Sequence, residues 1–560
     1  MVRGILAVFT KEIRGMHEAA YLLASFALLS QILGLVRDRL LASTFGISGT
    51  LDVYYAAFRI PDFLFTTIAS LFSLYAILPA LARAAGKEAR AVEGVLLWFF
   101  AFTSAAAAVA YVATPALTLQ LAPGFTGAAR VELIALTRIL LLQPILLGAS
   151  NVLASLTQFR SRFALYAVSP LLYNFGIIGG IVLLYPLFGL AGIAWGVVVG
   201  ASLHALIQVP HFLSERSRQE SSPSVRPPLR EILTLSLPRT AALGAGQLTL
   251  LALVALASTL APGSISALSF SMNLGSVPLA IIGMSYSVAA FPTLARLIGE
   301  GKRENFLLQI TVALRHILFW SVPATVLIIV LRAQLVRVVL GAGQFDWDAT
   351  RLTAAALAVF VLSLCAQSVT YLLARGYYAA GETARPLLIA LLSVAVSILS
   401  AVGFLQLFLH VAPFRYFVES LLRVSSVEST PILMLVLGYV VGALSNAFAT
   451  LWFFKRDFSI ALSPLWLTFW RGAASSIIGG FAAYLVLAAM GAVVDIDTFA
   501  GIFAQGLLGG LAGLLVTVGV LYALASPELR ETLDALARRF RDKPQVAVEP
   551  SELSSQTTLP

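Results

Sequence analysis

The densest group of charged side chains in an apolar part of this sequence lies between residues 37 and 62. It has three members at the end of one apolar stretch and three before the next: Arg37, Asp38, Arg39, Asp52, Arg59 and Asp62. An ionised group facing lipid is costly, so such residues normally face a cavity or a partner. Two interpretations stay open. The carboxylates pair with the arginines and clamp the two stretches, or Arg37 and Arg59 present paired donors to an anionic ligand.

Three further polar side chains could complete the same surface. Gln31 lies near the stripe of Arg37, Arg239 follows Pro238, and Asn273 lies between Ser271 and Ser276. We predict that these three contact the same ligand as Arg37 and Arg59. The remaining charges would orient the arginines or close a gate: Asp38, Arg39, Asp52 and Asp62.

Three other arginines, Arg138, Arg315 and Arg471, lie near the ends of apolar stretches. A long basic side chain in such a place usually extends its charge to the headgroup region while its stem stays in apolar surroundings. We expect that behaviour for all three.

The elements that must position these residues are helices that cross a membrane. Of the 560 residues, 59% are hydrophobic and only 11% are charged, and the mean hydropathy is +0.91. Apolar runs of about 20 residues, enough to cross the hydrocarbon core, recur along the chain. We predict an all-α polytopic fold with about fourteen spans, at 20–44, 61–82, 94–118, 133–157, 165–186, 188–212, 234–260, 264–294, 309–331, 352–374, 385–409, 430–454, 464–490 and 499–525.

Lysine and arginine predict the orientation of these spans. Twenty-four of the 37 basic residues fall in the terminal segments and in every second break, whereas the opposite breaks hold six. Basic residues mark the cytoplasmic side. Both termini should therefore be cytoplasmic, and the net charge of +10 reflects topology rather than nucleic-acid binding.

Several function classes find no support in the sequence. Phosphate-binding loops, His-Glu-x-x-His motifs and paired cysteines do not occur, and the single Cys365 lies among apolar residues. We expect no cofactor, no metal and no enzymatic activity. The first eighteen residues are too charged for a secretory signal.

The sequence also repeats itself at an offset of about 215 residues. Ala42-Ser-Thr reappears as Ala257-Ser-Thr, and Pro79 and Pro170 have counterparts in Pro292 and Pro386. The offset contains six spans, so the copies share one orientation and form two pseudo-symmetric six-helix lobes, as in duplicated transporters. We predict a cytoplasmic segment 1–19, a first lobe 20–213, a linker 214–230, a second lobe 231–456, two extra helices within 457–525, an amphipathic cytoplasmic helix within 526–543 and a disordered tail 544–560.

Several segments resemble the MurJ (MviN) family of bacterial lipid II flippases. These are Ser30-Gln-Ile-Leu-Gly-Leu-Val-Arg-Asp38, Phe45-Gly46, Asp52, Ala57-Phe-Arg-Ile-Pro61 and Leu78-Pro79, followed by Arg162-Phe163, Ser169-Pro-Leu-Leu-Tyr-Asn174, Gly376-Tyr-Tyr378 and Arg385-Pro386. The resemblance covers about residues 20–530. It implies a multidrug/oligosaccharidyl-lipid/polysaccharide exporter fold in the cytoplasmic membrane of a bacterium. This fold would move a lipid-linked peptidoglycan precursor between leaflets, with the last two spans forming a groove for its tail.

The resemblance also carries implications for single residues. Family members meet the pyrophosphate of the lipid with arginines in a central cavity. Arg37 matches one of these positions, and Arg59 keeps a basic residue where lysine is usual. Gln31, Phe65 and Asn273 stand where arginine is typical, and Ser70-Leu71 replaces a Glu-Gly pair.

The leading hypothesis is a flippase for lipid II that works by alternating access between the two lobes. Its partners would be a lipid-linked anionic glycan precursor, the bilayer and cell-wall synthesis proteins. Two alternatives stay open: an exporter of another lipid-linked oligosaccharide or amphiphile, and a transport-inactive scaffold for cell-wall assembly.

Overall fold

A computed structural model describes residues 16–72, 77, 81, 84, 86–160, 162–219, 229–425, 427–495 and 498–541. Within this part, residues 16–21, 231, 234, 235, 238, 239, 535, 536 and 538–541 are described by their backbone alone. Most of the expected N-terminal segment, part of the second span, most of the linker and the tail therefore lie outside the described residues.

The described chain is helical throughout and contains no strand, so the predicted all-α fold is confirmed. Twelve of its helices are long and apolar enough to cross a membrane. The two other predicted spans correspond to α2 (Met16–Phe45) and to the segment that starts with α4 (Arg59–Leu64). The predicted plan of about fourteen spans agrees with this arrangement.

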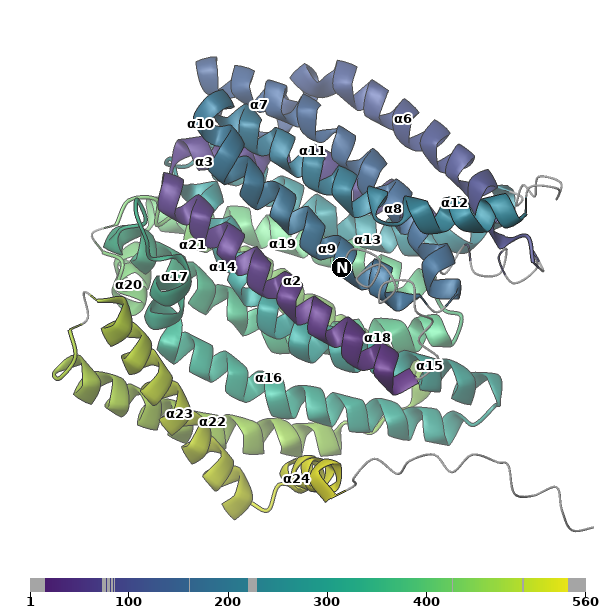
Figure 1. Ribbon diagram of the computed structural model, residues 1–560. Coiled ribbons are helices and arrows are strands. Elements are labelled where there is room, and N and C mark those ends of the chain that lie inside the picture. The colour runs from purple at the N-terminus through teal and green to yellow at the C-terminus, as the bar shows by residue number, and fades with distance from the viewer. Residues whose placement is uncertain are drawn as a thin grey trace, which may run out of the picture.

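The first half of the chain builds one group of helices. Most of them lie in the upper part of Figure 1, and α2 crosses the middle. After α2 they are α3 (Gly49–Ala57), α4, the π-helical turn η1 (Phe65–Ala69), α6 (Glu88–Leu121), α7 (Gly127–Leu140), α8 (Leu142–Phe159), α9 (Phe163–Gly179), the π-helical turn η2 (Gly180–Leu184), α10 (Tyr185–Phe188), α11 (Leu190–Leu206) and α12 (Val209–Arg218). Proline at the start of α12 favours a new helix there, so helix continues into the first residues of the expected linker.

The second half builds the lower group. Its helices are α13 (Leu229–Ser258), α14 (Ser264–Leu279), the π-helical turn η3 (Ala280–Met284), α15 (Ser285–Gly299), α16 (Arg303–Leu340), α17 (Trp347–Phe360), the 3₁₀ turn η4 (Val361–Ser363), α18 (Leu364–Ala379), α19 (Ala384–His410), α20 (Ala412–Leu422), α21 (Ile432–Phe458), α22 (Ser463–Gly491), α23 (Phe499–Ala523) and α24 (Pro527–Arg541). The turns η1 and η3 begin at Phe65 and Ala280, which lie 215 residues apart. This is the offset of the sequence repeat, so the same helical irregularity recurs at corresponding places.

Glycine sets the closest helix contact in the first half. The backbones of α9 and η2 meet that of α11 at Gly176 and Gly180 on one side and Gly196 and Gly200 on the other. A Cβ atom on Gly176 would collide with the Gly200 backbone. Small residues four apart allow such approach in membranes, where packing rather than the hydrophobic effect joins helices.

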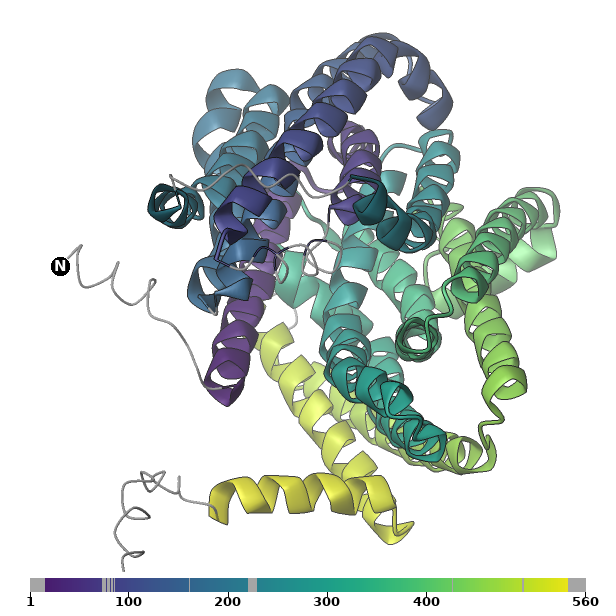
Figure 2. The same ribbon diagram turned by 90° about the vertical axis from the view of Figure 1, so that its right-hand side faces the viewer.

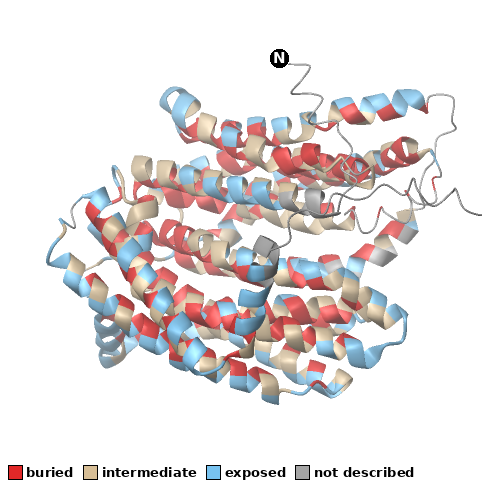
Figure 3. Ribbon diagram, turned by 60° about the horizontal axis from the view of Figure 1, so that its bottom comes forward, coloured by how far each residue is buried: buried red, intermediate tan, exposed pale blue. Residues whose placement is uncertain are grey.

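Apolar side chains cover the outside of the molecule. Exposed residues run along the outer faces of the helices rather than only at their ends (Figure 3), and they include Val112, Leu399 and Phe448, each more than 70% exposed. A water-soluble protein rarely exposes so much contiguous apolar surface. The distribution is that of a protein whose solvent is lipid.

Helix α24 covers the same residues over which the sequence predicts an amphipathic helix, and it runs across the end of α23 (Figure 2). Glu528 is 2% exposed and binds the guanidinium of Arg315 on α16 at 2.8 Å. The hydroxyl of Thr468 on α22 donates to the same carboxylate. Arg315 thus pairs with a buried acid instead of extending to the headgroups, which differs from the sequence expectation.

Loss of the Glu528 charge should release α24. Burial alone would raise the pKa of Glu528, but hydrogen bonds from Thr468, Ser526 and Arg315 outweigh it and lower the pKa below its ordinary 4.5. Charged hydrogen bonds contribute about 1.5–3 kcal/mol, so Glu528→Gln should speed amide exchange in α24 by about 10- to 100-fold. Because the folded pKa is lowered, this protection should persist at neutral pH and disappear as the pH falls through that lowered value.

Glu531→Gln is the matched control, because Glu531 pairs with His316 but is half exposed. An exposed pair contributes at most about 1 kcal/mol, so exchange should change less than about fivefold. Equal effects of the two substitutions would contradict the role of the buried carboxylate.

Candidate functional site

Three of the predicted site residues meet at one carboxylate. Arg37 donates from Nε and Nη2 to Oδ1 of Asp38, at 3.0 and 2.8 Å. The Nδ2 amide of Asn273, on α14, donates to Oδ2 of the same residue at 3.0 Å. Asp38 is 3% exposed. Because α2 belongs to the first half of the chain and α14 to the second, this carboxylate links the two halves.

Tyrosines surround this link, and the sequence interpretation did not include them. Tyr54 and Tyr55 lie near the charges of Arg37 and Asp38, and Tyr173 on α9 lies near Arg37. The hydroxyl of Tyr55 is buried without a hydrogen-bond partner in the described structure. The sequence signal that could have pointed to them is the pair Tyr54-Tyr55 between Asp52 and Arg59. The hydroxyl and the arginine together can donate to an anion.

Arg59 and Asp62 carry a second set of opposite charges in the first half. The charge of Asp62 acts on Arg59, yet the described structure contains no ion pair within 4 Å between them. The Nε atom of Arg59 is buried without a hydrogen-bond partner. An unsatisfied buried donor of this kind costs about 1–3 kcal/mol, which an anionic ligand would recover.

The other predicted site residues lie differently. Gln31 is on an exposed face of α2, and no described hydrogen bond joins it to the carboxylate of Asp38. The side chain of Arg239 lies outside the described residues. Phe65 opens the π-helical turn η1 and is half-buried.

Asp52 joins the two halves by capping a helix of the opposite half. Its carboxylate accepts hydrogen bonds from the backbone N–H of Gly263 at 2.8 Å and of Ser266 at 2.7 Å, and from the Ser266 hydroxyl. These groups begin α14, whose free N–H groups and dipole favour a negative charge. Gly263 has φ +92° and packs closely on Ile47, so a side chain there would strain the turn.

Further contacts close the same side of the molecule. Arg39 donates to the carbonyl oxygens of Val338 and Val339 at the end of α16. The N–H of Gln344 donates to Ser43, and that of Gly124 to the Ser258 hydroxyl. These contacts and those of Asp52 lie on the side of the molecule opposite to the start of α2. We call them together the opposite-side gate.

The halves also touch nearer the side where α2 begins. The Ser70 and Thr240 hydroxyls are 2.8 Å apart, and Gln247 donates to Thr66. The Ser236 hydroxyl donates to the carbonyl of Leu71. All three contacts join the segment after Arg59 to α13. The Asp38 carboxylate therefore lies between two sets of contacts that hold the halves together.

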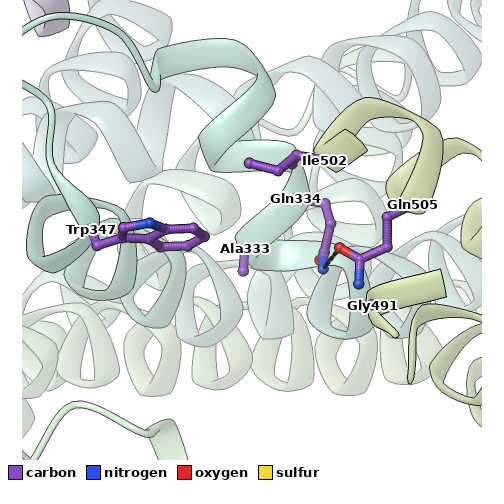
Figure 4. A pocket seen from close by; sticks show the side chains of 6 residues that line it. All are labelled: Ala333, Gln334, Trp347, Gly491, Ile502 and Gln505. Atoms are coloured by element: carbon purple, nitrogen blue, oxygen red, sulfur yellow. Dashed lines mark hydrogen bonds between the residues drawn. The ribbon is translucent and has the colours of Figure 1, made fainter. Parts of the chain in front are cut away.

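A small cavity of about 170 Å³ adjoins the last two spans. Gln334, Trp347 and Gln505 line it with three other residues (Figure 4), and Gln334 donates to Gln505 at 3.1 Å. Gln505 in turn donates to the carbonyl of Leu487. These two hydrogen bonds join α23 to α16 and α22, and the Gln505 amide is buried. Among the described residues, no group of histidine, cysteine and carboxylate side chains could hold a metal ion.

Comparisons with known proteins agree on one family. Residues 41–502 match the family model described as lipid II flippase MurJ. The chain is 25% identical over 416 residues to the lipid II flippase MurJ of Burkholderia cenocepacia, covering 70% of this chain and 79% of that protein. It is 30% identical over 383 residues to the probable lipid II flippase MurJ of Thermotoga maritima, covering 66% and 75%.

Solved structures show the same fold. A lipid II flippase MurJ in an inward closed conformation superposes with a TM-score of 0.71 at 20% identity, over 90% of this chain and 100% of that one. An inward-facing MATE multidrug transporter of the MOP superfamily superposes with a TM-score of 0.62 at 15% identity, over 79% and 98%.

Neutralising Asp52 should loosen the opposite-side gate. Asp52→Asn keeps the shape but removes the charge from three hydrogen bonds, at a cost of about 1.5–3 kcal/mol. We expect the population with separated halves to rise by about 10- to 100-fold. Spin labels at Thr126 and Thr259, one on each half and neither of them buried, in a Cys365→Ser background would report it as a longer distance.

Ser48→Ala serves as the control, because the Ser48 side chain caps α3 within its own half. Its distance distribution should match the parent. An unchanged distribution in Asp52→Asn would show that this carboxylate does not hold the gate.

Proposed function

The chain belongs to the lipid II flippase MurJ family, and from this membership we infer that it translocates lipid II across the membrane. It is a multi-pass membrane transporter, and its substrate is a lipid-linked precursor of peptidoglycan. No observation favours an exporter of another lipid-linked oligosaccharide or a scaffold without transport. We assign the transfer to the residues around Arg37, Asp38 and Arg59.

The observation that carries the proposed site is the shared carboxylate of Asp38. Arg37 is neutralised by Asp38, which Asn273 holds from the other half. A pyrophosphate offers the guanidinium more charge and the same two-pronged geometry. Substrate binding would therefore draw Arg37 away from Asp38 and weaken the link between the halves.

Arg59 is the second donor that we assign to the pyrophosphate. Its buried Nε lacks a partner in the described structure, and Asp62 keeps the charge from being isolated when no substrate is bound. The tyrosine hydroxyl of Tyr55 would add a neutral donor. The proposed surface is completed by one further charge, that of Arg239, and by two amides, those of Gln31 and Asn273.

Alternating access would use the two sets of contacts in turn. The opposite-side gate closes through Asp52 and Arg39, whereas Ser70 and Thr240 join the halves nearer the side where α2 begins. A ligand shifts such an equilibrium only by its difference in affinity for the two states. On this proposal, loss of Arg37 to the substrate leaves the Asp38–Asn273 link without its counter-charge, and this supplies such a difference.

We place both termini in the cytoplasm, on the charge asymmetry of the sequence. The opposite-side gate is then periplasmic, and α24 lies on the cytoplasmic leaflet. The last two spans, α22 and α23, would guide the lipid tail. The membrane potential would act on the net charge of the site with about 2.3 kcal/mol per charge per 100 mV. Cell-wall synthesis proteins are the partners that we expect beside the membrane.

Complementation tests the function directly. The chain should restore growth and outer-leaflet lipid II in a bacterium depleted of its own lipid II flippase. Arg37→Ala should abolish rescue and weaken lipid II binding to the purified protein by about 10- to 100-fold, because a charged hydrogen bond contributes about 1.5–3 kcal/mol. Arg59→Ala should act in the same direction.

Lys302→Ala is the charge-matched control, since Lys302 is exposed and pairs only with Glu300 in the described contacts. It should rescue fully. Failure of the well-expressed parent would contradict the function, whereas rescue by Arg37→Ala would contradict the site alone.

Cysteine accessibility tests the orientation. In a Cys365→Ser background, a membrane-impermeant maleimide added to intact cells should label Thr126→Cys but not Lys302→Cys, because the two positions lie on opposite sides of the membrane. Labelling of Lys302→Cys alone would place the termini outside.

A further inference from the structure

A second cavity lies on the lipid-facing surface of the first half, away from the shared carboxylate. Its volume is about 830 Å³, within the range of small-ligand sites. Side chains of α6, α7, α8 and α11 line it, and most are apolar. Val112, Trp195 and Leu142 are between 41% and 77% exposed, so the cavity opens to the surroundings of the protein, which at this surface are lipid.

One cation lies in this apolar lining. Arg138, near the end of α7, holds its guanidinium 4.6 Å from the centre of the Tyr111 ring. Its Nε donates to the Tyr111 carbonyl at 3.3 Å. That carbonyl needs a donor because Pro115, four residues later in α6, has no N–H. The proline thus accounts for the Nε bond and for the direction of the side chain.

The rest of the guanidinium is unsatisfied. An arginine has five N–H donors, and in the described part of the chain the Nη groups of Arg138 have no acceptor and no carboxylate pairs with it. A charge in apolar surroundings needs a counter-charge. The aromatic face of Tyr111 supplies only part of it, about 0.5–2 kcal/mol.

The depth of Arg138 identifies the kind of anion. Arg138 lies eleven residues from the start of α7 and Tyr111 ten from the end of α6, each about 15 Å along its helix. Helix α6 is about 51 Å long and exceeds the hydrocarbon core of about 30 Å. With the core centred on the helix, about 10 Å of α6 projects beyond it at each end, so a point about 15 Å from the end lies about 5 Å inside the acyl-chain boundary. A long basic side chain at that depth can reach toward the lipid phosphates.

We propose that this cavity, the Arg138 groove, binds an anionic phospholipid, with its phosphate on the Nη groups of Arg138 and an acyl chain along Val112, Leu142 and Trp195. The lipid comes from the leaflet at the end of α6, which is the periplasmic leaflet in the orientation proposed above. This site is separate from that of the transported lipid and does not depend on its identity.

Native mass spectrometry of the purified protein tests the groove. The probes are phosphatidylglycerol and phosphatidylcholine with the same acyl chains. The parent should retain phosphatidylglycerol preferentially, and Arg138→Gln should lower its retention at least about tenfold, as expected for a lost charge-assisted bond. Glutamine can still donate to the Tyr111 carbonyl, so the helix contact survives.

Two further variants separate charge, space and folding. Arg130→Gln removes an arginine of the same helix that does not line the cavity but donates to Pro115, and it should bind like the parent. Ala108→Phe fills the groove without removing Arg138 and should also lose the lipid. Thermal melting followed by circular dichroism should show all variants folded.

Three outcomes would decide against the proposal, and a fourth would separate it from the transport site. Equal retention of both lipids by the parent, or parent-like retention in Arg138→Gln, would overturn it. Displacement of phosphatidylglycerol by excess inorganic phosphate would overturn the lipid as the occupant. A transport defect in Arg37→Ala with normal lipid retention would leave the groove intact, so the two sites can fail separately.

Discussion

The cost of an unpaired charge in hydrocarbon governs the organisation of this protein. Asp38 and Asp52 are almost fully buried, and each is satisfied by donors from both halves of the chain or from the opposite half. If the halves separated without a substitute partner, Asp52 would lose the donors of Gly263 and Ser266, and Asp38 would keep Arg37 but lose Asn273. A buried carboxylate must keep a hydrogen-bond partner, because leaving it unpaired costs free energy. This need also suits Asp38 and Asp52 to link the halves, because a change of partner changes how the halves are held together.

The two carboxylates differ in what can replace their partners. Asp52 binds backbone N–H groups at a helix start, which water can satisfy once the opposite-side gate opens. Asp38 shares Arg37 with whatever anion enters, so its link responds to the substrate. Family membership gives lipid II as that substrate. In the proposed exchange, pyrophosphate replaces Asp38 as the partner of Arg37, whose guanidinium Asp38 already orients. The exchange therefore needs only this one arginine, although Gln31, Phe65 and Asn273 stand where the family typically has arginine.

The arginines outside the site also need partners for their charges, and the partners that they find differ. The sequence predicted for Arg138, Arg315 and Arg471 that the charge extends to the headgroup region. Arg315 instead meets the buried Glu528 of α24. Arg138 donates one hydrogen bond to a carbonyl that Pro115 leaves without a donor, and our proposal keeps the predicted headgroup contact for the rest of its guanidinium. In both cases a partner from a distant part of the sequence decides the direction of the side chain. For Arg138 the partner satisfies only part of the guanidinium, which is why we assign a lipid phosphate to the rest.

The sequence by itself determined the helical fold, the plan of about fourteen spans and the family, because each depends on hydropathy and local motifs that are read along the chain. It also placed Arg37, Asp38 and Asp52 in one cluster, since charge in an apolar segment is a local signal. Only the tertiary structure decided that Asn273 shares Asp38, that Asp52 caps α14, that tyrosines surround Arg37 and that Gln31 does not join Asp38. Those relations depend on how helices from two halves, more than 200 residues apart, rotate and cross. Packing of this kind is fixed by close contacts between the halves, such as Gly124 on Ser258 and Gly263 on Ile47, rather than by any local pattern.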